Sequence, residues 1–370
     1  MLQAHTSAAS LSDCWDTLLG NDFAFLKNGF LTALEESGAT SRENGWQPFH
    51  HSLQAEDGSV LGILPLFLKS HSHGEFTFDW GYAQAYEQAG GQYYPKLYCG
   101  APFTPATGPR FLAKSAETRR QLVAGLRRLC WQHGLSSAHV AYPLQADAAP
   151  LRNEGFLQRT DWQYHWHNAD YPDFEAFLAA LKPRKRKNIR QERRRVASAG
   201  FSFRRIHGHD ATREELEFAT RMYENTFDKK GNWAALGSSF FARCAHHVPR
   251  NLLFIFAYQH EEPVACAIFF VSDKTLYGRY WGCAKNEPLL HFETCFYQGI
   301  ELAIELKLST FEPGAQGVHK IARGFLPTRV STWHYFRDPG MQDAVARHLS
   351  RSEAALQAHE DELQLMNPYR

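Results

Sequence analysis

The sequence predicts a mixed α/β protein in which one unit of strands and helices is used twice. Apolar strands, a long helix, a short strand and a short helix precede Gly155-Phe156 in the first half, and the same order precedes Gly324-Phe325 in the second. Local residues agree as well, since Gly134-Leu135-Ser136-Ser137 matches Lys307-Leu308-Ser309-Thr310. A chain of 370 residues is also long enough for two domains, because single cores seldom exceed roughly 250 residues.

In the first half, apolar runs at 58–70 and 74–82 are expected to form an antiparallel pair of strands. The glycines and prolines of 91–112 predict a shaped loop that ends in a strand. A helix over 115–134 is indicated by its apolar stripe, with Ser115 as N-cap. The remaining expected elements are a helical region at about 11–37, a short strand at 136–143 and an aromatic strand at 153–166.

The second half is expected to contain three apolar strands within 251–283 and a long helix over 290–308. A short strand at 309–313 and a final strand within 323–336 follow. We expect four regions: an N-terminal unit (1–168), linking helices with a basic run (169–200), a C-terminal unit (201–340) and a C-terminal amphipathic helix (341–370).

Composition excludes several classes of protein. With 44% hydrophobic residues and a net charge of +1, the chain is neither disordered nor strongly basic. No run of about 18 apolar residues occurs and the N-terminus lacks a secretory pattern, so we expect a cytoplasmic protein without a transmembrane segment. The seven cysteines are scattered and include no C-x-x-C pair, and no acidic cluster completes the paired histidines, so no metal site is expected.

The repeated order resembles the acetyltransferase fold of the GNAT superfamily, in which Gly-Phe typically precedes the last strands. Longer strings are similar to the FemAB-like bacterial proteins, a doubled-GNAT family, over about residues 10–350; among them are LPLFLKSHSHGEFTFDWGYAQAY, RKRKNIRQERRRV and FEPGAQGVHKIARGFLPTRVSTWHYF. The resemblance implies two tandem GNAT-like domains in a Fem-type arrangement. It also implies an N-acyltransferase or aminoacyltransferase whose amine acceptor is a small molecule or peptide, such as a peptidoglycan precursor.

The same resemblance implies no required cofactor and an acyl donor that is either aminoacyl-tRNA or acyl-CoA. The loop after Cys283 lacks the Gly-rich turn that cradles the pyrophosphate of coenzyme A in GNAT enzymes, which favours the Fem-type comparison. The expected partners are therefore the acceptor and tRNA, with peripheral membrane contact left open and no DNA.

An amine that attacks an acyl carbonyl needs an acceptor for its proton and a cover for the developing oxyanion. Lys320 stands four residues before Gly324, where single-domain GNAT enzymes often carry a tyrosine acid and Fem-type transferases have a nearby lysine. We expect Lys320 to stabilise the reaction electrostatically, with His319 and Arg323 beside it. Alternatively, these are solvated residues of a short helix. The first copy has Leu151 at the position of Lys320, so the two copies differ where a site would lie.

Two further groups of residues are expected near the substrates. Glu293 is a candidate general base, although a carboxylate early in a helix also has a purely structural reason. Tyr280 and Trp281 would line the cleft or its core. On the acceptor side, a polar substrate would be held by residues of the first half, for which ordinary loop contacts are the alternative; these residues are Glu75, Asp79, Lys96 and Arg110.

A basic run at 181–196 contains nine Lys or Arg residues and one acid, Glu192. Helices are expected over 172–182 and 184–199, separated by Pro183. Cations in a first helical turn oppose the helix dipole, so the run predicts a phosphate or anion site at Arg184, Lys185, Arg186, Lys187 and Arg190. The alternatives are a solvated helix and a non-catalytic anion-binding or nucleic-acid-binding protein, although no DNA-reading motif is present.

Overall fold

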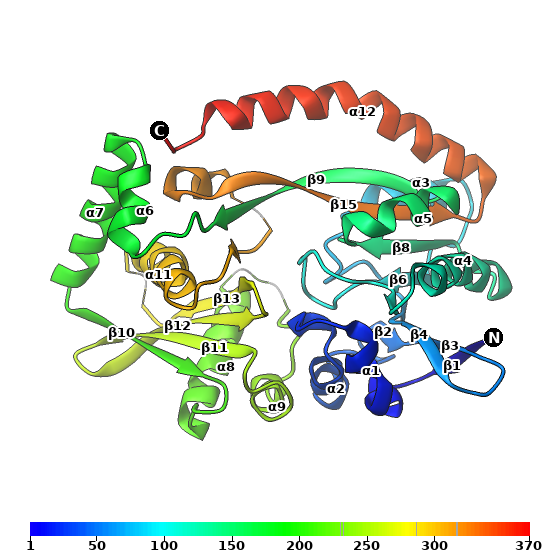
Figure 1. Cartoon of the computed structure of the whole chain (residues 1–370), viewed down its shortest axis with the longest axis horizontal. Coiled ribbons are helices and arrows are strands. Elements are labelled where there is room, and N and C mark those ends of the chain that lie inside the picture. Colours follow the sequence, from blue (N-terminus) through cyan, green and yellow to red (C-terminus); the bar gives the residue numbers. More distant parts are fainter. Residues whose placement is uncertain (230, 232, 286, 316) are drawn as a thin grey trace. The chain divides into compact units, whose positions relative to one another are not determined.

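Contacts divide the chain into two compact units. The first comprises Met1–Asp161 and Arg329–Ala358, and the second comprises Trp162–Thr328 and His359–Arg370. Figure 1 shows the computed structural model with its elements labelled. The structure describes residues 1–229, 231, 233–285, 287–315 and 317–370.

Two long strands pass from one unit into the other. Strand β9 (Leu157–His167) begins in the first unit, and its end pairs with β14 (Thr310–Glu312) of the second. Strand β15 (Leu326–Phe336) begins in the second unit, and its end pairs with β8 (Ser137–Ala141) of the first. The unit bounds therefore differ from the expected regions, because the last strand of each sequence repeat continues into the other unit.

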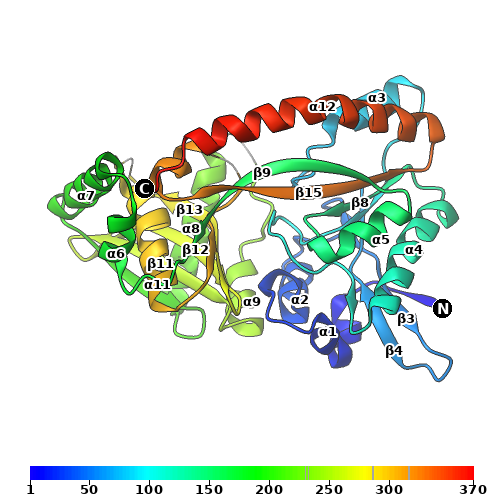
Figure 2. The ribbon, with the colours of Figure 1, turned by 45° about the horizontal axis from the view of Figure 1, so that its top comes forward.

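The main sheet of the first unit has the strand order β15-β8-β6-β5-β2. Strands β6 and β8 are parallel, and the other neighbours are antiparallel. A second, antiparallel sheet has the order β1-β3-β4-β7, and Figure 2 shows its β3–β4 hairpin. The new strands are β1 (Leu2–His5), β2 (Trp46–Pro48), β3 (His50–Gln54), β4 (Val60–Leu64), β5 (Phe67–Lys69), β6 (Lys96–Cys99) and β7 (Leu112–Ala113).

Helix α4 (Ala116–Gln132) supplies the main apolar face over these strands. Ser115 caps it as predicted, by accepting a hydrogen bond from the Thr118 amide. Leu122, Leu126 and Cys130 are buried in one cluster with residues of β6 and β8. The other helices of this unit are α1 (Ser12–Leu19), α2 (Asn28–Glu36), α3 (Trp80–Gln88) and α5 (Ala148–Asn153), followed by most of α12 (Pro339–Leu365).

The sheet of the second unit has the order β10-β11-β12-β13-β14-β9, with only β13 and β14 parallel among the pairings described. Its strands β11 and β12 are apolar throughout their buried parts, which identifies them as central strands. The new strands are β10 (Phe201–His207), β11 (Leu252–Gln259), β12 (Glu262–Val271) and β13 (Thr275–Cys283).

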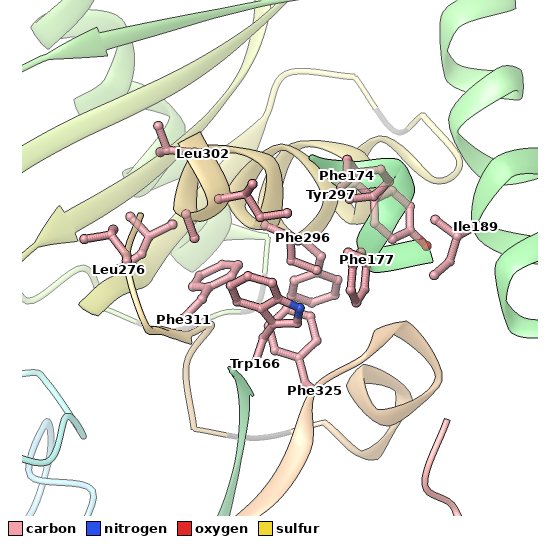
Figure 3. Packing of buried hydrophobic residues seen from close by; sticks show 14 of the residues in the cluster. Trp166, Phe174, Phe177, Ile189, Leu276, Phe296, Tyr297, Leu302, Phe311 and Phe325 are labelled. Carbon is pink, nitrogen blue, oxygen red and sulfur yellow. The ribbon is translucent and has the colours of Figure 1, made fainter. Parts of the chain in front are cut away.

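The helices of this unit enclose an aromatic core, shown in Figure 3, in which Trp166, Phe296, Phe311 and Phe325 are buried together. Helix α8 packs against β12 and β13 (Figure 1). The helices are α6 (Phe174–Ala180), α7 (Pro183–Ser198), α8 (Arg213–Asp228), α9 (Phe240–His247), α10 (Leu290–Phe292), a π-helical turn (Glu293–Tyr297), α11 (Gln298–Glu305) and a 3₁₀ helix, η5 (Val318–Arg323).

The two repeats end their helices in the same way. Gly134 and Lys307 both have a left-handed backbone, with φ of 64° and 52°, directly after the long helix. The amide of Phe156 donates to the carbonyl of Leu151 (3.0 Å), and that of Phe325 donates to the carbonyl of Lys320 (3.3 Å). The equivalence of Leu151 and Lys320 therefore holds in the backbone, and the structure confirms the mixed α/β class.

Two local expectations need correction. Residues 74–82 do not form a strand: 75–79 are irregular and Trp80 begins α3. Pro183 does not separate the two linking helices but is the first residue of α7, where its missing N–H is tolerated; the chain turns at Leu181-Lys182 instead. Among the described residues, no helix is long and apolar enough to cross a membrane.

Candidate active site

A pocket of about 240 Å³ lies in the second unit, beside the parallel strands β13 and β14. Residues of β12, β13, the π-helical turn, the loop after β14 and η5 line it. Its polar side chains are Arg279, His291, Cys295, His319 and Lys320, and its apolar walls include Phe269 and Phe296. A small polar group in this pocket would meet Arg279, Lys320 and two imidazoles within an aromatic enclosure.

Lys320 is held in this pocket by the backbone. Its side chain is 4% exposed, and its Nζ donates a hydrogen bond to the Gly314 carbonyl at 2.7 Å. Gly314 has a φ of 93°, a conformation that a residue with a β-carbon rarely adopts. The glycine therefore allows the turn that aims its carbonyl at the ammonium group, while Gln316 of the same loop lies outside the described residues.

Burial lowers the pKa of Lys320 to about 7, with the nearby Cys295 opposing and Arg279 adding to the shift. Burial also raises the pKa of the Cys295 thiol, which therefore stays protonated at neutral pH. Near pH 7, Lys320 exists in both protonation states. It can donate a hydrogen bond to a developing oxyanion, and its charge is strongly felt because little water surrounds it.

His319 lies directly before Lys320 and lines the same pocket. Burial, together with the charges of Lys320 and Arg323, lowers the pKa of His319, which keeps the imidazole neutral at physiological pH. Its ring centroid lies 5.8 Å from that of Phe292 and 6.0 Å from that of Phe296. A neutral imidazole in this place can accept a proton from an incoming amine.

Tyr280 and Trp281 both line the pocket from the end of β13. Trp281 packs edge-on against His291, with ring centroids 5.5 Å apart. Tyr280 packs edge-on against Tyr223 of α8 at 5.0 Å, and burial raises the pKa of its hydroxyl. The two aromatic residues thus form part of the pocket wall, and neighbouring rings hold both of them in place.

Glu293 does not line this pocket. Its carboxylate accepts hydrogen bonds from Arg193 Nε at 3.2 Å and from Gln298 Nε2 at 2.8 Å. Arg193 also pairs with Glu301, at 3.3 Å, so one guanidinium of α7 joins two acids of the helix beside it. Glu293 instead lines a second cavity, of about 500 Å³, together with the arginines of α7. This geometry gives Glu293 a structural role in docking α7.

Arg323 is also held away from the pocket. Its Nη2 donates to both carboxylate oxygens of Glu192, at 3.0 and 3.1 Å, and its Nε donates to the Tyr297 hydroxyl at 3.0 Å. The guanidinium lies over the Phe292 ring, 3.5 Å from its centroid. Arg323 thus joins η5 to α7 and to the π-helical turn, and its donors are occupied by the protein.

The basic run forms α7, which has only two buried apolar side chains, Ile189 and Val196. Arg190 pairs with Glu175 at the surface. By contrast, Arg184–Lys187 form no ion pair with any residue that the structure describes. Four cations in the first turn of a helix therefore have no carboxylate partner in the described chain, in a place that favours anions.

The polar residues predicted for the acceptor lie in the first unit and are buried. Lys96 Nζ donates to Glu75 Oε2 at 2.8 Å and contacts Asp79, and all three residues are 0% exposed. Burial alone would lower the pKa of Lys96, but the two carboxylates outweigh it and raise that pKa. Tyr93 donates to the same Asp79 carboxylate at 2.6 Å. The group forms a closed network rather than the lining of a cleft.

Arg110 has a similar structural place. It is 0% exposed, and its guanidinium donates to the carbonyls of Ala106 and Ala141 at 2.6 Å and of Pro109 at 2.8 Å. Ala141 ends β8, which is the repeat equivalent of β14. The second unit has its pocket beside its parallel strand pair, β13 and β14. Beside the equivalent pair of the first unit, β6 and β8, the Arg110 side chain binds backbone carbonyls instead.

Sequence reasoning missed Arg279, Cys295 and Arg193. Cys295 lies four residues after His291, so both could have been assigned to one face of the helix that begins at Leu290. Arg279 precedes the two aromatic residues that were predicted to line the cleft. No local pattern distinguishes Arg193 from the other arginines of the run, because its partners lie about a hundred residues further along the chain.

Solved structures with the same fold are distant in sequence. The C-terminal domain of an Agrobacterium fabrum protein named as a lysylphosphatidylglycerol synthetase has a TM-score of 0.57 and 10% identity, covering 94% of this chain and 97% of its own. FemX has a TM-score of 0.57 and 11% identity, covering 94% and 100%. L-PGS from Bacillus licheniformis has a TM-score of 0.53 and 11% identity, covering 86% and 95%. No curated protein sequence matches this chain.

The doubled order of strands and helices is thus the fold that this chain shares with FemX, a doubled GNAT-like fold. A model of the FemAB-like family, described as peptidoglycan biosynthesis/recognition, matches residues 8–370. The chain belongs to this FemAB-like family.

Proposed function

We propose that this protein transfers an acyl or aminoacyl group to an amine of a peptidoglycan precursor, and that the reaction takes place at the Lys320 pocket. The observation that carries the proposal is a lysine that is almost fully buried, lines a pocket and has a pKa lowered to about 7. A buried group with such a perturbed pKa in a concave site is a candidate functional group. The family supports the substrate class.

The reaction would begin when the amine attacks the acyl carbonyl. The attacking nitrogen gives its proton to the neutral His319 imidazole, and the carbonyl oxygen becomes an oxyanion. The protonated Lys320 donates a hydrogen bond to this oxyanion, and its own charge is better stabilised as the negative charge develops. When the carbonyl re-forms, the donor's oxygen or sulfur leaves and takes up the proton held by His319, and the amide product is released.

We propose that Arg184–Lys187 bind a phosphate-bearing part of the donor or acceptor. Both candidate donors, aminoacyl-tRNA and acyl-CoA, carry phosphates, and these four side chains have no carboxylate partner among the described residues. Peptidoglycan precursors that carry a diphosphate would meet the same charges. In this assignment, Glu192 and Arg193 dock the helix while its first turn faces the ligand.

The test is a transfer assay with the purified protein. It would be incubated with radiolabelled aminoacyl-tRNA or acyl-CoA, each with a uridine-diphosphate-linked muramyl pentapeptide whose lysine supplies the amine. The expected result is a labelled peptide with one donor class and none with the Lys320→Ala variant. Absence of transfer from both donors to this and other amine acceptors would contradict the proposal and leave a non-catalytic anion-binding protein as the better description.

A further inference from the structure

Residues 75–80 of the first unit have an inverted burial pattern. The polar side chains of Glu75, Thr77 and Asp79 are 0% exposed. The aromatic residues that alternate with them are more exposed: Phe76 is half-buried, Phe78 is 39% exposed and Trp80 is 46% exposed. A surface segment normally buries its apolar side chains and exposes its charged ones. Here the fold places the charges inside and the aromatic rings outside.

The inverted arrangement is held at both sides. Inside, Lys96 binds the Glu75 and Asp79 carboxylates. Along the backbone, the Tyr142 hydroxyl donates to the Phe76 carbonyl at 2.6 Å, and Arg159 donates to the Thr77 carbonyl, also at 2.6 Å. The segment is thus fixed by hydrogen bonds from other elements before any ligand is present.

The backbone of this segment is also strained. Phe76 and Phe78 have φ of 59° and 51°, in the left-handed region that bulky side chains rarely adopt. Such a conformation costs free energy and persists where the surrounding structure imposes it, often at ligand sites. The left-handed backbone and the buried charges together place the rings of Phe78 and Trp80 at the surface.

We define the aromatic face as His73, Phe76, Phe78 and Trp80. The ring centroids of Phe76 and Phe78 lie 6.5 Å apart, and those of His73 and Trp80 lie 4.8 Å apart. The four rings thus form two edge-on pairs, and each pair has at least one exposed ring.

The composition around this face selects the chemistry of its ligand. Residues 70–95 contain no Lys or Arg, so the segment itself would not attract an anionic membrane surface. Arg159 reaches it from β9, but this guanidinium donates to the Thr77 and Phe78 carbonyls and lies 3.9 Å from Asp161. They also contain no Leu, Ile, Val or Met, which a face that packs on a protein helix or enters a bilayer would normally include. Aromatic rings with neighbouring imidazole groups suit a neutral ligand that has both C–H faces and hydroxyl groups.

We propose that the aromatic face binds the pyranose rings of a glycan. The C–H bonds on one face of a sugar ring carry partial positive charge and are attracted to the negative face of an aromatic ring. His73 can exchange hydrogen bonds with sugar hydroxyl or acetamido groups. The inference extends the proposed function, since it assigns recognition of the saccharide part of a peptidoglycan acceptor to the first unit.

The test measures glycan binding without any donor. Isothermal titration calorimetry would use a tetrasaccharide of N-acetylglucosamine and, separately, the sugar-free stem pentapeptide. We expect saturable binding of the tetrasaccharide, weakened about tenfold or more in the double variant Phe78→Ala/Trp80→Ala, because each lost ring contact contributes a factor of up to about ten. The conservative variant Phe78→Tyr/Trp80→Phe should retain most of the binding.

Trp131 provides a matched control, because it is 51% exposed on the same unit but lies in α4 and is not part of the aromatic face. Trp131→Ala should bind the tetrasaccharide as the unchanged protein does, and circular dichroism would establish that all variants fold. Lys320→Ala should also bind normally, so a failure of the transfer reaction would leave this proposal standing.

Four outcomes would overturn the proposal. The first is no binding of the tetrasaccharide by the unchanged protein. The second is equal binding by the Phe78→Ala/Trp80→Ala variant. The third is that the unchanged protein binds neutral phosphatidylcholine vesicles but not the glycan, and that the Phe78→Ala/Trp80→Ala variant no longer binds the vesicles. That result would assign the aromatic face to a membrane surface. The fourth is binding of the sugar-free pentapeptide but not of the tetrasaccharide, which would assign recognition to the peptide.

Discussion

Glu192 and Arg323 form an ion pair, with Arg323 Nη2 donating to Glu192 Oε1 at 3.0 Å. Glu192 is the one acid within the basic run 181–196, and Arg323 lies in η5, three residues after Lys320. The pair therefore joins the helix that carries the unpaired cations to the short helix that carries the buried lysine. It explains why one acid stands among nine basic residues.

The first prediction concerns this pair. Arg323→Met and Glu192→Gln should each destabilise the fold, because each leaves a partly buried charge without its partner. The double variant should lose less than the sum of the two, with a coupling free energy of about 1–3 kcal/mol. Urea unfolding of the four proteins in a double-mutant cycle would measure it, and additive effects would contradict a structural role for Arg323.

The second prediction concerns the reacting group. Lys320→Ala should lower kcat/KM for transfer by about 100-fold or more, as expected when a preorganised oxyanion donor is removed. The protein should remain folded, since an alanine is readily buried. Initial rates with the labelled donor, together with thermal unfolding, would test both statements.

Leu151→Ala is the matched control, because Leu151 is the repeat equivalent of Lys320 and is 0% exposed. This variant should lose about 2–5 kcal/mol of stability through the cavity that it creates, while transfer at a permissive temperature is retained. A fully active Lys320→Ala protein would refute the site assignment.

The third prediction is a pH dependence of stability. The pKa of Lys320 is about 7 in the folded protein and near 10.4 in an unfolded chain, so the unfolded chain binds more protons between these pH values. Stability therefore rises with pH across this window. Lys320→Met lacks this group, so it should be more stable than the unchanged protein at pH 7, and the difference should shrink towards pH 10.

Lys69 must be separated from this effect. Burial likewise lowers the pKa of Lys69 to about 7, and this residue remains in the Lys320→Met variant. The comparison of unfolding free energies at pH 7 and pH 9.5 between the two proteins cancels the contribution of Lys69. A difference that does not change with pH would show that Lys320 is protonated normally in the fold.

The fourth prediction concerns the first turn of α7. Replacing Arg184–Lys187 by Gln should weaken binding of tRNA or of a diphosphate-linked precursor, and should lower the slope of log affinity against log salt by about 1 for each lost phosphate contact. Filter binding or fluorescence titration at several salt concentrations would measure this slope.

A control should remove the same charge elsewhere. Lys114, Arg120, Arg127 and Arg128 lie in or just before α4 and are exposed, so their replacement by Gln changes net charge equally. This control should leave the slope nearly unchanged. Equal losses in both variants would indicate attraction by net charge alone rather than a site in α7.

The fifth prediction concerns the buried network of the first unit. Lys96→Met should destabilise the fold by about 3–5 kcal/mol, because the Glu75 and Asp79 carboxylates would stay buried without their cation. Lys114→Met, at an exposed position, should change stability by less than about 0.5 kcal/mol. Chemical denaturation would compare the two. A mild effect of Lys96→Met would mean that water enters the network and solvates both acids.

Much of the fold could be predicted from the sequence because the signals that define its elements are local and occur in both repeats. The residues around Gly155 and Gly324 carry helix-end and strand signals that do not depend on distant partners. Lys320 was selected by its place four residues before Gly324 and by the GNAT and Fem resemblance, and the contrast with Leu151 supported the choice. In the structure, Lys320 lines a pocket. The functional role of Lys320 stays a prediction.

The remaining differences have one physical cause, which is that partners distant in sequence decide them. Glu293 and Arg323 were predicted to meet substrates, but Arg193 and Glu192 of α7 bind them. Residues 74–82 alternate with the period of a strand, and this pattern could not reveal that the polar residues are the buried ones, because their cation, Lys96, comes from β6. Pairings of this kind have no local signature.

The path of β15 also determines how the protein can be divided. A fragment that ends at residue 161 would lack the stretch Thr332–Phe336 that pairs with β8. The open edge of β8 would then offer unpaired amide and carbonyl groups to other chains, a common origin of aggregation. The two repeats are therefore not separable modules. Expression of either half alone should yield insoluble protein. A circular permutation would have to keep β15 with the strands of the first half.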